Sequence, residues 1–456
     1  MRSKRGLGAG VILVLSLALA ASGCTSDSDA PPTSAPSTTA PANPPLTFGV
    51  FGPDEENAAF QETVDAWNAK PDVSQVKMTT WPNQSAMRRA IEGGEELPDV
   101  FLASRSDLRW LLDNDYTQPV DELLDERNVD FGDGYSRDAL QAFSTDDRLQ
   151  CMPYAVSPMV IYYNTSLVDF TKMRNRGLDA PDEDATSWNF DQFSAAAEFA
   201  SRPARGAKGV HIAPTLAGLS PFIESGGGSV FDDYDDPKSL SFSSDGSKSA
   251  LERTLELLRK PQVTLDESQL ASASPLKWFT RGKLGMIAGY RSLVPQLRLV
   301  PGLNFDVMPM PVLDSSATVG DVSGLCLSAK AASTAAGADF MVHELADDSV
   351  ATVTRTGYLA PANLAVALSD DFLQPGRQPE HANFFNSTVR SMRFQPLIDT
   401  IPALEQTVQP SLEDLVYGVG VLDLDAVTQE IDDESKTVLD PESVSPSPSD
   451  SASPSD

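Results

Sequence analysis

Short apolar runs alternate with helical repeats over the first part of this 456-residue chain. Leu46 to Phe51 is an apolar run that ends at a Gly-Pro turn, Val76 to Thr80 alternates as a strand does, and Asp99 to Leu102 is a third run. We predict a strand from each of the three runs. The segments between them have helical spacing, so the order of elements favours a parallel sheet with helices on its faces.

The intervening helices are indicated by apolar residues that recur on one face. Phe60, Val64 and Trp67 have this spacing, and Met87 to Ile91 and Asp107 to Leu112 predict two further helices. Ligands of such sheets bind beyond the carboxyl ends of the strands. Those ends are residues 51–54, 80–83 and 104–107.

The N-terminus has the three parts of an export signal. Basic residues stand among the first five positions, Val11 to Ala20 form an apolar stretch, and small residues lead to Cys24. Residues 1–23 predict a signal peptide, since the apolar stretch is shorter than the about 20 residues that a membrane span needs. The run from Ala21 to Cys24 resembles the bacterial lipobox, although Ala21 replaces the commoner leucine. The resemblance implies a diacylglyceryl group on Cys24, whereas the alternative is an ordinary secretory signal with an incidental cysteine.

Both ends of the mature chain have compositions that do not form a core. Residues 24–45 are rich in Ser, Thr, Ala and Pro, and we expect them to be a disordered tether. Residues 432–456 end in Ser-Pro repeats with Asp, and we expect a disordered acidic tail. The folded part is therefore predicted to span residues 46–431, which is long enough for two domains.

The formal net charge of the chain is −31. A field of that sign repels nucleic acids and anionic lipid headgroups, so a nucleic-acid partner is not expected. Three histidines and no Cys-x-x-Cys motif argue against a metal site, and we expect no metal and no cofactor. After Cys24 only Cys151 and Cys326 remain, which either pair or stay as two buried thiols.

Five segments in order resemble the extracellular solute-binding proteins of ATP-driven importers, in the branch that contains maltose-binding protein. The resemblance covers nearly all of residues 46–430. The segments are Leu97 to Phe101, Pro119 to Leu124, Met152 to Tyr154 leading into Val160 to Asn164, Phe279 to Met286, and Gly357 to Ala362.

This resemblance implies an α/β fold of the type II periplasmic-binding-protein kind, with two discontinuous lobes that are joined by a hinge. The first lobe would be residues 46–154 with 326–380, and the second would be residues 158–322 with 385–430. The chain would cross between them near residues 151–157 and 324–328, on strands that lie side by side in the family. Because Cys151 and Cys326 lie one in each crossing strand, the resemblance also implies a disulfide between them.

Carrying over the family's site positions gives a set of candidate ligand-binding residues. A sugar needs apolar platforms for its ring faces and planar polar groups for its hydroxyls. Arg291 departs from the family, which often has a stacking tryptophan there, so a charged ligand group becomes an option. The candidates are Phe51, Asp54, Trp81, Ser106, Asp107, Tyr154, Ser157, Tyr290, Arg291 and Arg355.

The expected function is that of a lipid-anchored, monomeric solute-binding protein on the outer face of a bacterial cell membrane. It would capture a sugar or sugar derivative between its lobes and deliver it to the permease subunits of an ABC transporter. Palmitate-type acyl chains on Cys24 would hold it at the membrane. No catalytic residues are expected. The alternatives are an anchored glycoside hydrolase, whose two carboxylates need no local motif, and a partner-binding lipoprotein without ligand affinity.

Overall fold

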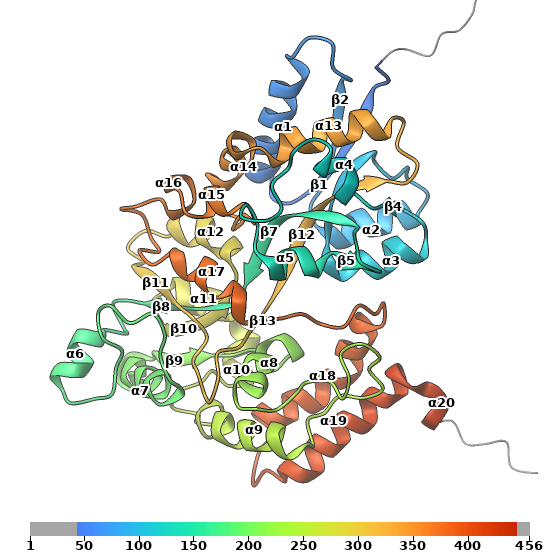
Figure 1. The fold of residues 1–456 in the computed structure, drawn as a ribbon. Helices are drawn as coiled ribbons and strands as arrows, with labels where there is room; N and C mark the ends of the chain where they lie inside the picture. The colour runs from blue at the N-terminus through green and yellow to red at the C-terminus, as the bar shows by residue number, and fades with distance from the viewer. Residues whose placement is uncertain (1–42, 445–456) are drawn as a thin grey trace, which may run out of the picture. The chain divides into compact units, whose positions relative to one another are not determined.

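Residues 43–444 are described in a computed structural model, and they form two larger sheets with helices around each (Figure 1). The expected signal peptide, Cys24 and nearly all of the expected tether lie outside the described residues. None of the helices within residues 43–444 has the length and apolar character that a membrane crossing requires.

The first sheet contains the three strands predicted at the start of the chain. They are β1 (Leu46–Phe51), β2 (Val76–Trp81) and β3 (Val100–Ser104), with β1 in the middle and all three parallel. The long strand β12 (Thr318–Ser328) pairs antiparallel with β3. The prediction of a parallel sheet is thus confirmed for these three strands.

Helices that follow the first two strands in the sequence cover this sheet, because the apolar residues of each helix share one face. In α1 (Asp54–Asn68) the predicted residues Phe60, Val64 and Trp67 are all buried, and Asn83 caps α2 (Gln84–Glu92) by accepting the N–H of Ala86. Further elements around the first sheet are β4 (Thr117–Gln118), α3 (Leu108–Asp113), α4 (Asp121–Asp125), α5 (Arg137–Ala142), the ribbon of β5 (Ser144–Thr145) and β6 (Arg148–Leu149), α13 (Thr334–Leu345), α14 (Asp347–Thr354) and α15 (Leu364–Ala367).

The second sheet has the strand order β11-β8-β10-β9. Strand β8 pairs antiparallel with both of its neighbours, and β9 pairs parallel with β10. Its core contains Trp188, Phe193 and Phe222. The strands are β8 (Val160–Asn164), β9 (Lys208–His211), β10 (Leu284–Gly289) and β11 (Phe305–Met308).

The remaining helices belong with the second sheet. They are α6 (Phe170–Asn175), α7 (Phe190–Ala200), α8 (Leu216–Ser225), α9 (Asp245–Leu258), α10 (Glu267–Ser272), α11 (Pro275–Thr280), α12 (Val294–Arg298), α16 (Asp370–Leu373), α17 (Asn383–Ser387), α18 (Ile401–Tyr417), α19 (Leu424–Leu439) and α20 (Pro441–Val444).

The chain passes between the two sheets on neighbouring strands. Strand β7 (Cys151–Pro158) pairs antiparallel with β12 and leads directly into β8, and β13 (Met392–Arg393) pairs with the beginning of β12. Cys151 and Cys326 are register partners on β7 and β12, with their Cα atoms 4.3 Å apart, and they form a disulfide. The pairing that the family resemblance implied is therefore confirmed.

The C-terminal end differs from its prediction. We expected a disordered tail from Asp432 onward, but α19 continues to Leu439 and packs beside α18 (Figure 1). The expectation is wrong for residues 432–444, because Ile431 and Ser435 are buried and the Asp432 carboxylate accepts backbone hydrogen bonds from Phe242 and Ser243. Residues 445–456 of the expected tail lie outside the described part of the chain.

Candidate functional site

A cavity of about 540 Å³ lies between the carboxyl end of β3 and the beginning of α18, and we call it the central cavity. Helix α2 and the residues after β3 line it on the side of the first sheet. Ala217 of α8, Tyr290 after β10 and the beginning of α18 line it on the side of the second sheet, and the segment 393–399 between β13 and α18, whose Phe394 packs against the first core, completes the lining. Its charged lining residues are Arg88, Arg89, Glu92, Arg105, Asp107, Asp321, Arg393, Asp399 and Glu405.

The turn after β3 brings three consecutive polar residues to this cavity. Strand β3 ends at Ser104, whose hydroxyl accepts the N–H of Ser106 and so starts the short 3-10 helix of Arg105–Asp107. All three residues of that helix line the cavity. This agrees with the expectation that ligands meet a parallel sheet beyond the carboxyl ends of its strands.

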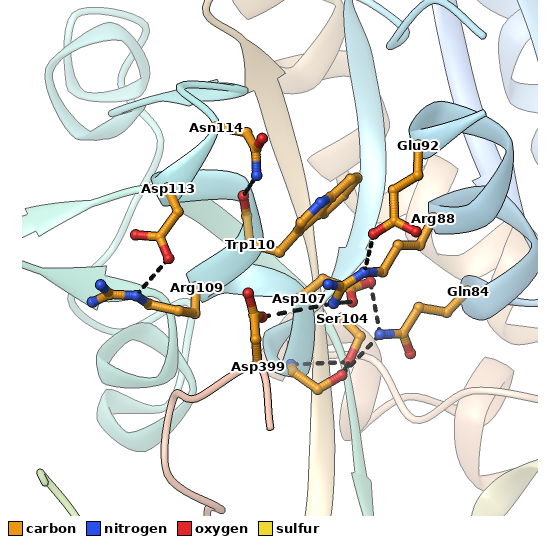
Figure 2. Close-up of polar contacts among 11 residues, drawn as sticks. Gln84, Arg88, Glu92, Ser104, Asp107, Arg109, Trp110, Asp113, Asn114 and Asp399 are labelled. Carbon is orange, nitrogen blue, oxygen red and sulfur yellow. Dashed lines mark hydrogen bonds and ion pairs between the residues drawn. The ribbon is translucent and has the colours of Figure 1, made fainter. Parts of the chain in front are cut away.

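Asp107 is held by groups from α2. Gln84 Nε2 donates to Asp107 Oδ2 at 2.7 Å and to Ser106 Oγ at 2.8 Å. Arg88 Nη1 is 3.3 Å from Asp107 Oδ1 and 3.7 Å from Asp399 Oδ1, and the Arg88 guanidinium lies over the ring of Trp110 (Figure 2). Burial raises the pKa of Asp107, although the hydrogen bonds from Gln84 and Arg88 oppose that rise.

Arg105 joins the turn after β3 to the segment between β13 and α18. Its Nη1 donates to the carbonyl oxygen of Gln395 at 2.7 Å, and its guanidinium lies 4.9 Å from the ring centroid of Phe394. Burial lowers the pKa of Arg105 to about 10, with Asp321 opposing the change. Burial raises the pKa of Asp321 to about 6, and Asp321 also accepts a hydrogen bond from the Ser104 hydroxyl. Arg105 Nε is buried without a protein partner.

Three of the ten candidate residues from the sequence meet in this cavity, namely Ser106, Asp107 and Tyr290. Tyr290 follows β10 and is half-buried, and its carbonyl oxygen accepts a hydrogen bond of 2.6 Å from the Tyr162 hydroxyl. Burial raises the pKa of the Tyr290 hydroxyl to about 12, so it is present as a neutral donor.

Five other candidates belong to the first sheet and its crossing strand but do not line the cavity. Phe51, Trp81 and Tyr154 pack in the first core, where the Tyr154 side chain is 1% exposed and its ring lies 5.4 Å from that of Phe60. The remaining two, Asp54 and Ser157, are an exposed first residue of α1 and a half-buried residue of β7 opposite Asp321.

The two candidate arginines also lie elsewhere. Arg291 is fully buried in the second core, where its guanidinium is 4.7 Å from the ring centroid of Phe372 and 5.3 Å from that of Phe385. Arg355 forms an ion pair of 3.1 Å with Asp371 near the surface. Neither lines the central cavity.

Sequence reasoning missed the residues that come from distant parts of the chain. Arg105 directly precedes two of the candidates, and that adjacency could have identified it. No local signal identifies Asp321 or the segment 393–405, because β12 and α18 reach the cavity only through the sheet pairing and the packing of α18. Among residues 43–444, no three His, Cys, Asp or Glu side chains are arranged to hold a metal ion.

Several solved structures resemble this chain over most of its length. An ABC substrate-binding protein from Listeria monocytogenes in complex with cycloalternan has a TM-score of 0.70 and 17% identity, over 87% of this chain and 98% of that one. The GacH receptor of Streptomyces glaucescens, solved unliganded and with acarbose, has a TM-score of 0.68 and 16% identity over 87% and 98% of the two chains. The corresponding values for UspC of M. tuberculosis are 0.67 and 15%, over 86% and 100%.

These similarities establish the fold as the two-lobed periplasmic-binding-protein fold, as expected from the sequence. A search among curated proteins gives no match. A sequence model of the family described as bacterial extracellular solute-binding protein matches residues 58–379.

Proposed function

Because this chain belongs to the bacterial extracellular solute-binding proteins, we propose that it captures a sugar or sugar derivative in the central cavity and delivers it to an ABC importer. Binding and release are sufficient for this role, so no covalent chemistry is part of the proposal. The observation that carries it is the lining of the central cavity, which combines fixed polar groups with apolar surfaces from both lobes.

The polar groups suit a ligand with many hydroxyls. Carboxylates such as Asp107 and Asp321 accept hydrogen bonds from hydroxyls, and the Arg105 guanidinium donates them. Gln84 and Arg88 fix the position of the Asp107 carboxylate before any ligand arrives, which reduces the entropy lost on binding.

The apolar part of the lining suits the faces of sugar rings. Tyr290 and Phe394 supply aromatic surface, and Ile398 and Pro402 supply aliphatic surface. Two structures of similar fold carry cycloalternan and acarbose, which supports a carbohydrate ligand for this cavity as well. Their low sequence identity leaves the particular sugar to experiment.

Closure of the two lobes would enclose the ligand. A ligand that contacts one lobe first and the other lobe afterwards favours the closed arrangement by its additional contacts, and such hinge motions are known from periplasmic binding proteins. The permease would then recognise the closed form. We further propose that a diacylglyceryl group on Cys24 holds the protein at the outer face of the cell membrane, within reach of that permease.

Thermal unfolding against a panel of ligands tests the proposed capture. The protein is secreted as the Cys24→Ser variant and heated with mono-, di- and oligosaccharides, polyols and glycerophosphodiesters. A ligand at a hundred times its Kd stabilises the folded state by about 2.7 kcal/mol, so a true ligand raises Tm. If no member raises Tm, the sugar assignment is wrong, and turnover of any member would instead indicate a hydrolase.

Matched variants locate the binding site of any ligand found. Asp107→Asn is expected to raise Kd about tenfold, because a charged acceptor is lost from the cavity. Asp113→Asn is the control, since Asp113 is exposed and pairs with Arg109 outside the cavity. Equal affinities of the two variants would place the ligand elsewhere. Labelling with radioactive palmitate, lost in Cys24→Ala, tests the anchor separately.

A further inference from the structure

Three arginines lie together in the second lobe, outside the central cavity. Arg298 Nη1 and Arg377 Nη1 both donate to the Oε1 atom of Gln374, at 2.6 and 3.2 Å. Burial, together with the neighbouring charges of Arg291 and Arg377, lowers the pKa of Arg298 to about 10. We call Arg291, Arg298 and Arg377 the arginine cluster.

No acidic side chain within residues 43–444 forms an ion pair with any member of this cluster. That is unexpected in a chain with 65 acidic and 34 basic residues. Nearby, Arg355 does pair with Asp371, and in the central cavity Arg88 approaches three carboxylates. The acceptor shared by Arg298 and Arg377 is the neutral amide oxygen of Gln374, so the cluster keeps its positive charge uncompensated.

Several donors of the cluster are buried and unused. Arg291 is 0% exposed, and its Nη2 donates to the carbonyl oxygen of Phe372 at 3.3 Å. Among residues 43–444, its Nε and Nη1 atoms have no partner, and neither does Nη2 of Arg298. Leaving buried charged donors without acceptors costs more than leaving neutral ones, so such groups normally have a partner.

The aromatic contacts of Arg291 do not supply the missing hydrogen-bond acceptors. Phe372 and Phe385 lie within 4.7 and 5.3 Å of its guanidinium carbon and attract its charge through their ring faces. The N–H groups of a guanidinium point outward in its own plane and need acceptor atoms there. A small anion offers charge and several acceptor positions at once, and arginine is the side chain best suited to bind it.

We propose that Arg291 and Arg298 bind a small inorganic anion, chloride or a tetrahedral oxyanion, as a structural ligand of the second lobe. The anion accepts from the unused donors of both residues and compensates the charge of the cluster. Exchange with solvent proceeds past Arg298, which is half-buried, and Arg377, which is exposed. By compensating these charges the anion stabilises the packing of α12 against the segment that contains Phe372 and Gln374.

Calorimetry of the secreted Cys24→Ser protein at constant ionic strength tests this site. Sodium gluconate, whose anion is too large for a site between two side chains, is replaced stepwise by chloride, bromide, sulfate or phosphate. We expect a saturating rise in Tm of about 2 °C or more with at least one of them. A response to halides alone identifies a chloride site, and a response to sulfate and phosphate identifies an oxyanion site.

Sulfate and phosphate also stabilise proteins in general, so the measured quantity is a difference between variants. Arg298→Gln is expected to lose the saturating rise, and Arg281→Gln, an exposed arginine outside the cluster, is expected to keep it. Arg291→Met is expected to lose it too; if that variant does not fold, Arg298→Gln decides. An equal rise in Arg298→Gln and Arg281→Gln, or no anion dependence in the parent protein, overturns the proposal.

Diffraction from crystals in bromide gives an independent readout. An anomalous peak within hydrogen-bond distance of Arg291 and Arg298 supports the site. A peak at crystal concentrations without any effect on Tm in solution shows only adventitious binding, and overturns a structural role.

Discussion

Arg105 donates a hydrogen bond of 2.7 Å to the carbonyl oxygen of Gln395 and thereby joins the end of β3 to the segment that leads into α18. Helix α18 packs in the second core through Leu404 and Val408, whereas β3 belongs to the first. The bond therefore holds the segment that leads into α18 against the end of β3, where Phe394 also packs on the first core. Because its donor is charged and mostly buried, we expect it to contribute more than an exposed hydrogen bond.

Arg105→Ala is expected to shift the unliganded protein toward more open arrangements. The variant removes a charge-assisted hydrogen bond of about 1.5–3 kcal/mol and the stacking on Phe394. Small-angle X-ray scattering should report a larger radius of gyration for the variant. Arg109→Ala is the matched control, because Arg109 is exposed and pairs with the neighbouring Asp113. The same radius for both variants would mean that Arg105 does not hold the lobes together.

The disulfide is expected to stabilise the protein without affecting solute binding. Cys151 and Cys326 are 175 residues apart in the sequence, and removing such a link costs about 2–5 kcal/mol. Urea unfolding of Cys151→Ala/Cys326→Ala should show this loss, and reductant should have no further effect on the double variant. Its affinity for a solute should be unchanged, since neither cysteine lines the central cavity. A large change in affinity would contradict this.

Glu344 is expected to make stability depend on pH. It is fully buried beside Thr63, and burial raises its pKa from 4.5 to about 8. Between those two values the folded state binds a proton that the unfolded state has lost, so the free energy of unfolding falls as the pH rises through this window.

Glu344→Gln should remove part of that dependence, because the amide does not ionise. We expect the variant to be less destabilised than the parent protein by about 2 kcal/mol between pH 5 and pH 8.5. Urea unfolding at both pH values measures the difference. Glu62→Gln, an exposed position on α1, should follow the parent protein. An equal change in the free energy of unfolding between the two pH values for all three proteins would show that ionisation of Glu344 does not destabilise the folded state.

Asp432 is expected to be a stabilising residue. Its carboxylate accepts the backbone N–H groups of Phe242 and Ser243 at 2.7 and 2.9 Å. Asp432→Ala leaves both N–H groups without that acceptor and should lower the free energy of unfolding by about 1–3 kcal/mol. Asp433→Ala serves as the control, since Asp433 is exposed and pairs with Lys436, and should change stability by less than about 1 kcal/mol.

The first sheet could be predicted from sequence because its strands are local and continuous. The run from Leu46 to Phe51 is strand β1 without change, and β2 and β3 begin or end within two residues of their predicted bounds. The prediction failed at Asp432, where disorder was expected. Its acidic neighbours suggested disorder, whereas the burial of Thr428, Ile431 and Ser435 at helical spacing places α19 in the core.

Residues of the candidate site could be predicted from the sequence only where they directly follow the carboxyl end of a strand. Ser106 and Asp107 follow a strand end, and the sheet brings that end to the cavity. Trp81 was expected to follow a strand end, but it is the last residue of β2 and packs in the core. Tyr290 and Arg291 are adjacent in sequence, yet one lines the cavity and the other is buried in the second core. No local pattern distinguishes these outcomes.

Every strand of the second sheet lies between Cys151 and Cys326 in the sequence. The chain from Cys151 to Cys326 and the disulfide between them therefore form one closed covalent ring, which contains the whole second sheet. The disulfide itself joins two strands of the first sheet. A protease that cuts the chain once anywhere inside this ring produces two fragments that stay linked through sulfur. An extracellular protein built this way can be cut between the strands of its second sheet and still remain a single molecule.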